Sequence, residues 1–130
     1  MAKLTEPQIE LLTAPNYGNV ATVRSDGSPH VTPVWVDWDG EYVIFNTAVG
    51  RAKEKHLRRD PRVAVEVFAQ ENPYSYVSID GTAELSEEGA DAHIDKLAKK
   101  YLGQDQYPHR QPGERRIIVR IRPERVDGRS

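Results

Sequence analysis

The sequence predicts a mainly β protein of the α+β class, an antiparallel barrel with helices packed outside, and three observations lead to this fold class. The strand-like runs are rich in Val, Thr, Tyr and Trp, residues that favour a pleated, half-buried surface. Connections of hairpin length join consecutive runs, which indicates antiparallel pairing. Helical segments are interspersed among the strands, as expected when helices cover a barrel. The chain has 130 residues and fits a single domain over residues 1–130.

The first half of the chain begins with a helix signal. Thr5-Glu6-Pro7-Gln8 has the form of a capping box with an early Pro, and it predicts a helix that runs to about Thr13. Asp39-Gly40 is a strong hairpin signal between two later runs. Three strands are expected in this half, each followed by a turn: 19–24, 30–38 and 41–47.

The second half alternates helices and strands. Residues 51–59 lack β-branched side chains and stop at Asp60-Pro61, so they predict a short helix. Ser86 is expected to cap a longer helix that Gly103 ends. The apolar residues of that helix form one stripe: Ile94, Leu97, Ala98, Tyr101 and Leu102. The strands expected in this half are 62–69, 75–85 and 116–122.

The composition excludes several classes of protein. Eighteen basic against twenty acidic residues leave a net charge of −2, which argues against a nucleic-acid-binding protein. The absence of cysteine rules out disulfides and zinc–thiolate sites. No run approaches the roughly 18 apolar residues of a membrane-spanning helix. The N-terminus has no apolar run of a signal peptide, so we expect a cytoplasmic protein that does not contact the membrane.

The most informative pair of residues for function is Arg51 and Lys53. Both follow Gly50 at the predicted start of a helix, where free N–H groups and the helix dipole disfavour cations. A bound anion explains them, because N–H groups, dipole and both cationic side chains would converge on a phosphate. The alternative is a solvated basic helix, since further cations follow at Lys55 and in Arg58-Arg59.

The four histidines do not indicate a metal site, because none has a known ligand spacing. His93 is expected on a helix surface, and His30, which opens the second strand, is the one histidine to test for substrate contact. Strict alternation would place Trp35 and Trp38 on opposite faces of one strand, so at most one can face a given site. No catalytic set stands out, and the catalytic residues are therefore left unassigned.

Several separated segments resemble the pyridoxamine-phosphate-oxidase-like split-barrel superfamily. In that superfamily a strand ending in Thr leads into a basic turn, a short helix and an Asp/Asn-Pro-Arg-Val strand. The segments that carry the resemblance are Ser28–Val34, Val43–Thr47, Gly50–Lys53, Leu57–Val63 and Asp80–Glu84. The resemblance covers about residues 16–103, and residues 116–126 look like the closing strand of the family. It implies an antiparallel, FMN-binding-like split β-barrel with flanking helices.

Within the superfamily the chain is similar to the branch that binds the deazaflavin coenzyme F420. That branch has Arg-Ala-Lys followed by Leu-Arg-Arg-Asp-Pro-Arg, as here in Arg51-Ala52-Lys53 and Leu57–Arg62. Pyridoxamine-phosphate oxidases proper carry Ser-Arg-Lys at that turn and a C-terminal extension for their substrate. The resemblance therefore implies F420 as the cofactor and leaves FMN as the alternative.

The resemblance also implies which residues bind the cofactor. Arg51 and Lys53 would hold its phosphate, and Tyr74 and Tyr76 would come from the facing subunit of a homodimer with the cofactor at its interface. The implied cofactor-binding residues are Thr32, Pro33, Val34, Asn46, Thr47, Arg51, Ala52, Lys53, Tyr74 and Tyr76. The implied activity is hydride transfer from reduced F420 to an unsaturated or conjugated small molecule. The alternatives are an FMN-dependent oxidoreductase of the same fold and a non-enzymatic cofactor-binding protein.

Overall fold

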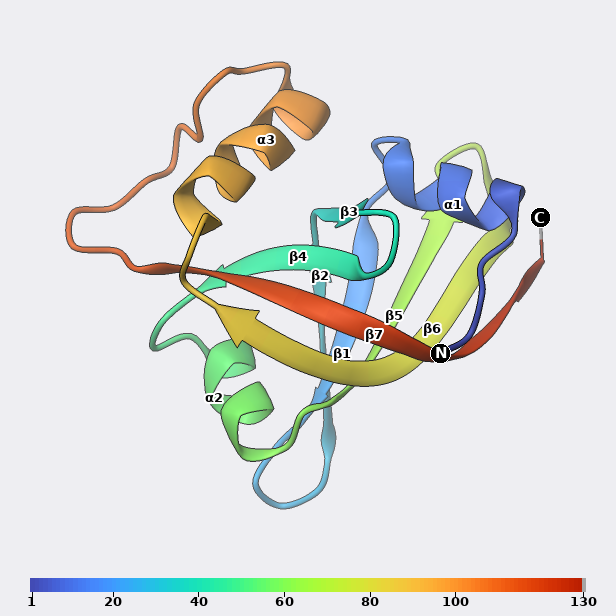
Figure 1. Ribbon diagram of the computed structural model, residues 1–130, viewed down its shortest axis with the longest axis horizontal. Helices are drawn as coiled ribbons and strands as arrows, with labels where there is room; N and C mark the ends of the chain where they lie inside the picture. The colour runs from blue at the N-terminus through green and yellow to red at the C-terminus, as the bar shows by residue number, and fades with distance from the viewer. Residues whose placement is uncertain (130) are drawn as a thin grey trace.

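In the computed structural model, which describes residues 1–129, a seven-stranded antiparallel sheet curls between the helices Glu6–Thr13 (α1) and Ala90–Leu102 (α3) on one side of the view and the helix Ala52–Arg59 (α2) on the other (Figure 1). The strands are Gly18–Val23 (β1), Pro29–Val34 (β2), Val36–Trp38 (β3), Val43–Ala48 (β4), Arg62–Ala69 (β5), Asn72–Ser86 (β6) and Arg116–Arg129 (β7). The expected mainly β class is confirmed.

The order of the strands explains why the sheet curls. It runs β2-β1-β5-β6-β7-β4-β3, so β2 and β3 form the two edges of the sheet. These two strands are consecutive in the chain, and only Trp35 separates them. The edges must therefore approach each other at Trp35, which bends the sheet into a barrel that is open between β2 and β3. The expected split β-barrel is confirmed.

The prediction of one strand over residues 30–38 was wrong, because β2 and β3 are separate strands on opposite edges. Val34 pairs with Gly18 of β1, whereas Val36 pairs with Phe45 of β4. The chain changes partner at Trp35, and strict alternation does not continue through such a corner. The argument that Trp35 and Trp38 must face opposite sides consequently does not apply.

The barrel interior holds the side chains that alternate inward from the long strands. Val65 and Val67 of β5 and Val77 and Ile79 of β6 are buried, as the alternation predicts. In β7 the sequence predicts the same interior face: Ile117, Val119 and Ile121. Ile118 of the opposite face is buried as well, because it packs with Ala90 and Ile44 where α3 begins.

The start of the long helix differs from the prediction. Ser86 still pairs with Ile118 as the last residue of β6, so it does not cap the helix. The N-cap is Gly89, whose φ of +76° favours glycine. The helix end agrees with the prediction, because Gly103 adopts a left-handed conformation there. The predicted stripe is buried at its first three residues, Ile94, Leu97 and Ala98.

Strand β6 also begins earlier than residue 75, where the sequence predicted it. Asn72 already pairs with Ala69 of β5, so the segment 72–74, which lies outside the predicted strands, is part of a hairpin. The register shifts between Phe68 and Ala69. A bulge of this kind hides the alternation on which the prediction of a strand start relies.

Two side chains of α3 form hydrogen bonds at the Trp35 corner, the point between β2 and β3 where the chain changes from one sheet edge to the other. The Tyr101 hydroxyl accepts a hydrogen bond from the N–H of Val36 (3.0 Å) and donates to the carbonyl of Asn16 (2.6 Å). The Lys100 ammonium donates to the carbonyls of Leu12 and Val36, at 2.6 and 2.5 Å. These contacts connect α1, β3 and α3, and they fix the position of the residue between the two edge strands.

Candidate cofactor site

A cavity of about 320 Å³ lies where the end of β2, strand β4, the start of α2 and the inner side of α3 meet. Six of the ten residues predicted to bind the cofactor line it: Pro33, Val34, Asn46, Thr47, Arg51 and Lys53. Thr32 lies beside it, because its hydroxyl contacts Lys53. The structure thus brings together residues that are up to 21 positions apart in the chain.

The start of α2 forms the cationic side of the cavity. Gly50 turns the chain into the helix with a φ of +93°, and Arg51 is the N-cap, without a side-chain hydrogen bond to cap the first turn. Glu54 is buried; it accepts from the N–H of Gly50 (2.9 Å) and from Nε of Arg58 (2.9 Å). The hydrogen bond from Gly50, followed by that from Arg58, lowers the pKa of Glu54. This carboxylate balances part of the charge at the helix start but is already occupied by Arg58.

Lys53 carries a half-buried positive charge that has no carboxylate partner among the described residues. Its ammonium is half-buried and donates to Oγ1 of Thr32 at 3.0 Å. No carboxylate of residues 1–129 forms an ion pair with it. Burial, and then the charge of Arg51, lowers the pKa of Lys53. A cation held in this way stabilises an anion that enters the cavity.

Thr47 supplies an unsatisfied polar atom in the same place. The residue is 1% exposed, and its Oγ1 is buried without a hydrogen-bond partner among the described residues. Buried hydroxyl groups normally have a partner, and an exception calls for a ligand or a water. An oxyanion in this cavity would give Thr47 an acceptor, so the residues present fit a phosphate group.

Sequence reasoning missed a network of polar residues on the other side of Asn46. The guanidinium of Arg116, the first residue of β7, donates from Nε to Oδ1 of Asn46 at 2.8 Å. It also pairs with Glu114 (3.1 Å), whose second oxygen lies 3.4 Å from Arg51. Arg116 lines the cavity although it is 5% exposed. The one signal in the sequence was a charged residue directly before the apolar run Ile117-Ile118-Val119.

The prediction that His93 lies on a helix surface was wrong. The residue is 8% exposed, and its Nδ1 accepts from the side-chain amide of Asn46 at 3.0 Å. Burial lowers the pKa of His93 to about 4, although the charge of Asp37 opposes the shift, so the ring is neutral near pH 7. Helix periodicity placed His93 at the edge of the apolar stripe, and β4 covers that edge.

Aromatic side chains surround the rest of the cavity. Trp35 stacks on Tyr101 with 5.4 Å between ring centroids and an angle of 7° between their planes. Tyr107 meets the edge of Trp35 at 6.0 Å, and His109 lies 5.7 Å from Tyr107. Trp35, Tyr107 and His109 all line the cavity, whereas Trp38 packs against the barrel core. Trp35 is therefore the tryptophan that faces the site.

The loop that carries Tyr107 and His109 lies against α3 (Figure 1). The N–H of Tyr107 donates to Asp95 of α3 at 2.8 Å, and Arg110 pairs with the same carboxylate at 2.7 Å. The loop joins the long helix, which Gly103 ends, to the strand that begins at Arg116. Its two cavity residues have no periodicity from which sequence reasoning could find them.

Three residues that sequence reasoning considered lie elsewhere. Tyr74 is 74% exposed and lines a separate hollow near the start of β6; Tyr76 does not line the cavity either. His30 is not among the cavity residues; its ring meets that of His56 at 5.1 Å between β2 and α2. Within a single chain, none of these three contributes to the cavity.

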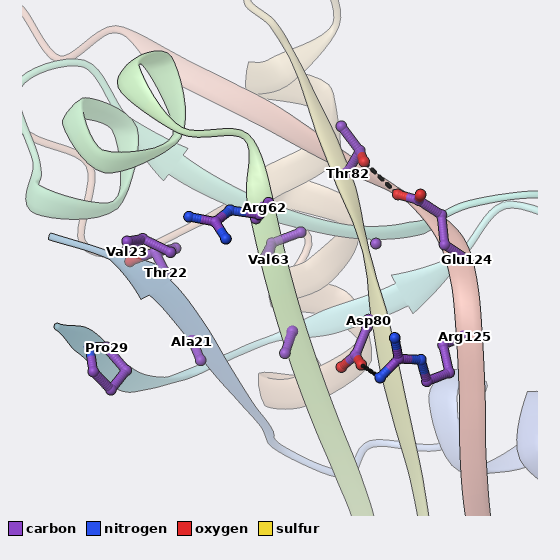
Figure 2. Close-up of a pocket in the computed structure, with 12 residues that line it drawn as sticks. Ala21, Thr22, Val23, Pro29, Arg62, Val63, Asp80, Thr82, Glu124 and Arg125 are labelled. Atoms are coloured by element: carbon purple, nitrogen blue, oxygen red, sulfur yellow. Dashed lines mark hydrogen bonds and ion pairs between the residues drawn. The ribbon is translucent and has the colours of Figure 1, made fainter. Parts of the chain in front are cut away.

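A second hollow of about 450 Å³ lies across the outer face of β1, β5 and β6 (Figure 2). Small apolar side chains such as Ala21 and Ala64 form its floor. Its cations are paired: Arg125 with Asp80 at 3.4 Å, and Arg62 with Asp60 outside the hollow. This larger hollow offers no unpaired cation among the described residues and is the weaker candidate for a phosphate site.

Residues 1–129 offer neither a group of metal ligands nor a helix that could span a membrane. No three His, Asp or Glu side chains there come together in a group that could hold a metal ion. In the same part of the chain, no helix has both the length and the apolar character needed to cross a membrane.

Comparison with known proteins identifies the family of the chain. The sequence matches the family described as pyridoxamine 5'-phosphate oxidase over residues 4–130. The chain belongs to this family. The match extends from the segment before α1 through β7, so the strands, helices and cavity described above all lie within the family's region.

Two proteins that are similar to this chain are named as reductases, and a third shares its fold. The structure of an F420 reductase is 33% identical, with a TM-score of 0.83, covering 95% of this chain and 98% of that chain. The F420H2-dependent biliverdin reductase of Mycobacterium tuberculosis (strain CDC 1551 / Oshkosh) is 25% identical over 127 residues, which are 97% of this chain and 88% of the relative. HupZ of Group A Streptococcus shares the fold at 22% identity and a TM-score of 0.67, covering 95% of this chain and 92% of that chain.

Proposed function

We propose that this protein is an F420-dependent oxidoreductase that transfers a hydride from the reduced deazaflavin to an unsaturated or conjugated small molecule. The observation that carries the proposal is the convergence of Arg51, Lys53 and the unpartnered hydroxyl of Thr47 in one cavity. Two cations, a helix start and a free hydroxyl form a suitable site for a phosphate. Support for the deazaflavin comes from two relatives, an F420 reductase and an F420H2-dependent biliverdin reductase.

The roles of the residues follow from their positions. Arg51 and Lys53 bind the cofactor phosphate, Thr47 donates to it, and the exposed Ala52 contributes the backbone N–H between the two cations. Bound deazaflavin supplies the hydride. Thr32, Pro33 and Val34 would lie along the cofactor ring, and their backbone groups would contact its polar edge. The chain thus positions the ring and excludes water from the cavity.

We also propose that the chain acts as a cytoplasmic homodimer, with one cofactor-binding domain over residues 1–130 in each subunit. Tyr74 and Tyr76 lie outside the cavity of their own chain, which fits a contribution to the partner's site. The hollow of Figure 2, with its apolar floor, is a surface that a second subunit would cover. Within the same fold the alternative cofactor is FMN, because both cofactors carry a phosphate.

Titration of the purified protein with F420 and with FMN, followed by cofactor fluorescence, tests the proposal. We expect saturable F420 binding that is at least about tenfold tighter than FMN binding, a difference of about 1.4 kcal/mol. Preference for FMN would instead support the FMN-dependent oxidoreductase. Tight F420 binding without oxidation of reduced F420 by any of a panel of conjugated acceptors would support the non-enzymatic cofactor-binding protein.

A further inference from the structure

We infer that Arg116 is an additional ligand-binding residue, which donates to an oxyanion, either a phosphate or a carboxylate, bound in the cavity. The inference rests on the proposed function, since it assigns a further contact within the same site. Neither the sequence nor the resemblance to the family indicated this residue.

The donors of Arg116 are only partly used. Its side chain is 3% exposed, Nε donates to Asn46 at 2.8 Å and Nη1 donates to Glu114 at 3.1 Å. Nη2 makes no hydrogen bond to any of residues 1–129, and Arg116 is one of the residues that line the cavity. A guanidinium has five N–H donors, and burying it is costly when they are unmatched. The unmatched donors are therefore available to a ligand.

Neighbouring groups fix the orientation of this guanidinium. The Asn46 amide that accepts from Arg116 donates in turn to the carbonyl of Ala90 and to Nδ1 of His93, both at 3.0 Å. The ring of Tyr107 lies 5.2 Å from the guanidinium carbon. A binding group held by its neighbours before the ligand arrives loses little conformational entropy on binding. Asn46 and His93 are in this account positioning residues for Arg116.

The balance of charge also favours an anion. Three cations, Arg51, Lys53 and Arg116, line the cavity, and Glu114 is the carboxylate that contacts them, at 3.4 Å from Arg51 and 3.1 Å from Arg116. Two positive charges remain in excess, because Glu54 is bonded to Arg58 instead. Glu114 itself shows that an oxyanion can be shared between Arg51 and Arg116. A ligand oxyanion beside it would be held by the same two guanidinium groups.

The test compares substitutions inside the cavity with a matched pair outside it. Arg116→Lys keeps the positive charge but removes the donor fork, and Glu114→Gln removes the competing carboxylate. Arg115→Lys and Glu87→Gln are the controls, because Arg115 and Glu87 form an ion pair at 2.5 Å that does not line the cavity. Near-ultraviolet circular dichroism checks that each variant is folded. The probes are F420 and the corresponding deazaflavin riboside, which lacks phosphate and carboxylates.

We expect Arg116→Lys to weaken F420 binding roughly 10- to 100-fold, the range for one hydrogen bond to a charged group, and to leave the riboside unaffected. Glu114→Gln should strengthen F420 binding several-fold, and the controls should leave it unchanged. If Arg116 has a purely structural role, Arg116→Lys should weaken the binding of both probes equally. That result would overturn the inference.

A third probe, benzoate, is titrated into the F420-saturated protein to distinguish an oxyanion of the cofactor from one of the substrate. Loss of F420 affinity in Arg116→Lys assigns the contact to an oxyanion of the cofactor, whereas unchanged F420 binding with loss of benzoate binding assigns it to a substrate carboxylate. If Arg116→Lys changes neither F420 binding nor benzoate binding, the inference is wrong while the proposed function stands. If wild-type protein does not bind F420, the proposed function fails first.

Discussion

Lys53 donates a hydrogen bond to the hydroxyl of Thr32 across 3.0 Å, and this contact joins the first turn of α2 to strand β2. An ammonium has three donors, so two remain for a ligand after Thr32 has accepted one. Arg51 adds its charge next to Lys53. The contact shows how the barrel presents a partly buried cation to the cavity in a fixed orientation.

Lys53→Ala should weaken F420 binding roughly 10- to 100-fold, because it removes a charge-assisted contact to the phosphate. Lys53→Arg should retain part of the affinity. Thr32→Val, which removes only the hydroxyl, should cost less than either. The matched control is Lys3→Ala, since Lys3 is exposed and does not line the cavity. Equal F420 affinity in Lys53→Ala and Lys3→Ala would contradict the role of Lys53.

His93 should make the folding stability depend on pH. Its folded-state pKa of about 4 lies below the ordinary value of 6.5, so its contribution is fully present above pH 6.5 and is lost as the pH falls toward 4. Between pH 7 and pH 5 this group should lower the free energy of unfolding by about 2 kcal/mol. Urea unfolding at pH 7 and at pH 5 measures this change in the free energy of unfolding.

His93→Gln should remove that pH dependence, because a glutamine side chain can accept from Asn46 without titrating. His109→Gln is the control, since His109 is exposed. A slope between pH 7 and pH 5 that is the same in wild-type protein and in His93→Gln would show that His93 is not buried as a neutral ring.

Lys100→Met should destabilise the protein by about 1–3 kcal/mol. The substitution leaves the Leu12 carbonyl without its hydrogen-bond donor and removes one of the donors to the Val36 carbonyl. Lys99→Met is the matched control. Lys99 pairs with Asp105 at 3.3 Å on the surface, where both side chains are well exposed, so its loss should change stability by less than about 0.5 kcal/mol. Similar unfolding midpoints for the two variants would show that the Trp35 corner does not depend on Lys100.

Cofactor binding should quench the fluorescence of Trp35 and leave that of Trp38 unchanged, because only Trp35 lines the cavity. Trp35→Phe should therefore abolish the change in tryptophan emission on addition of F420. Trp38→Phe should preserve it. The opposite result would mean that the cofactor ring does not lie near the Trp35 corner.

Sequence reasoning predicted those parts of the fold that local signals determine. The capping box at Thr5 is formed as expected, and α2 ends at the residue before Asp60-Pro61. The alternation in β5 identified the barrel interior correctly. Each of these features depends on residues a few positions apart, where turn chemistry and side-chain period act directly.

The features that sequence reasoning missed depend on which strands become neighbours in the sheet. Nothing local shows that β2 and β3 lie on opposite edges, because Trp35 interrupts no pattern in the residues around it. Burial of His93 and Arg116 likewise follows from the packing of β4 against α3 and β7. The anion-binding role of the cationic pair at the start of α2 was predicted from helix electrostatics. The contact of Lys53 with Thr32 and the place of Arg116 beside the same cavity could be identified only from the structure.

The most direct test of the central claim is the position of the phosphate in a crystal of the protein with F420. We predict that its oxygens lie about 2.7–2.9 Å from Nζ of Lys53 and contact the Arg51 guanidinium and the Thr47 hydroxyl. A phosphate bound elsewhere, for example in the hollow on the outer face of the sheet, would contradict the account.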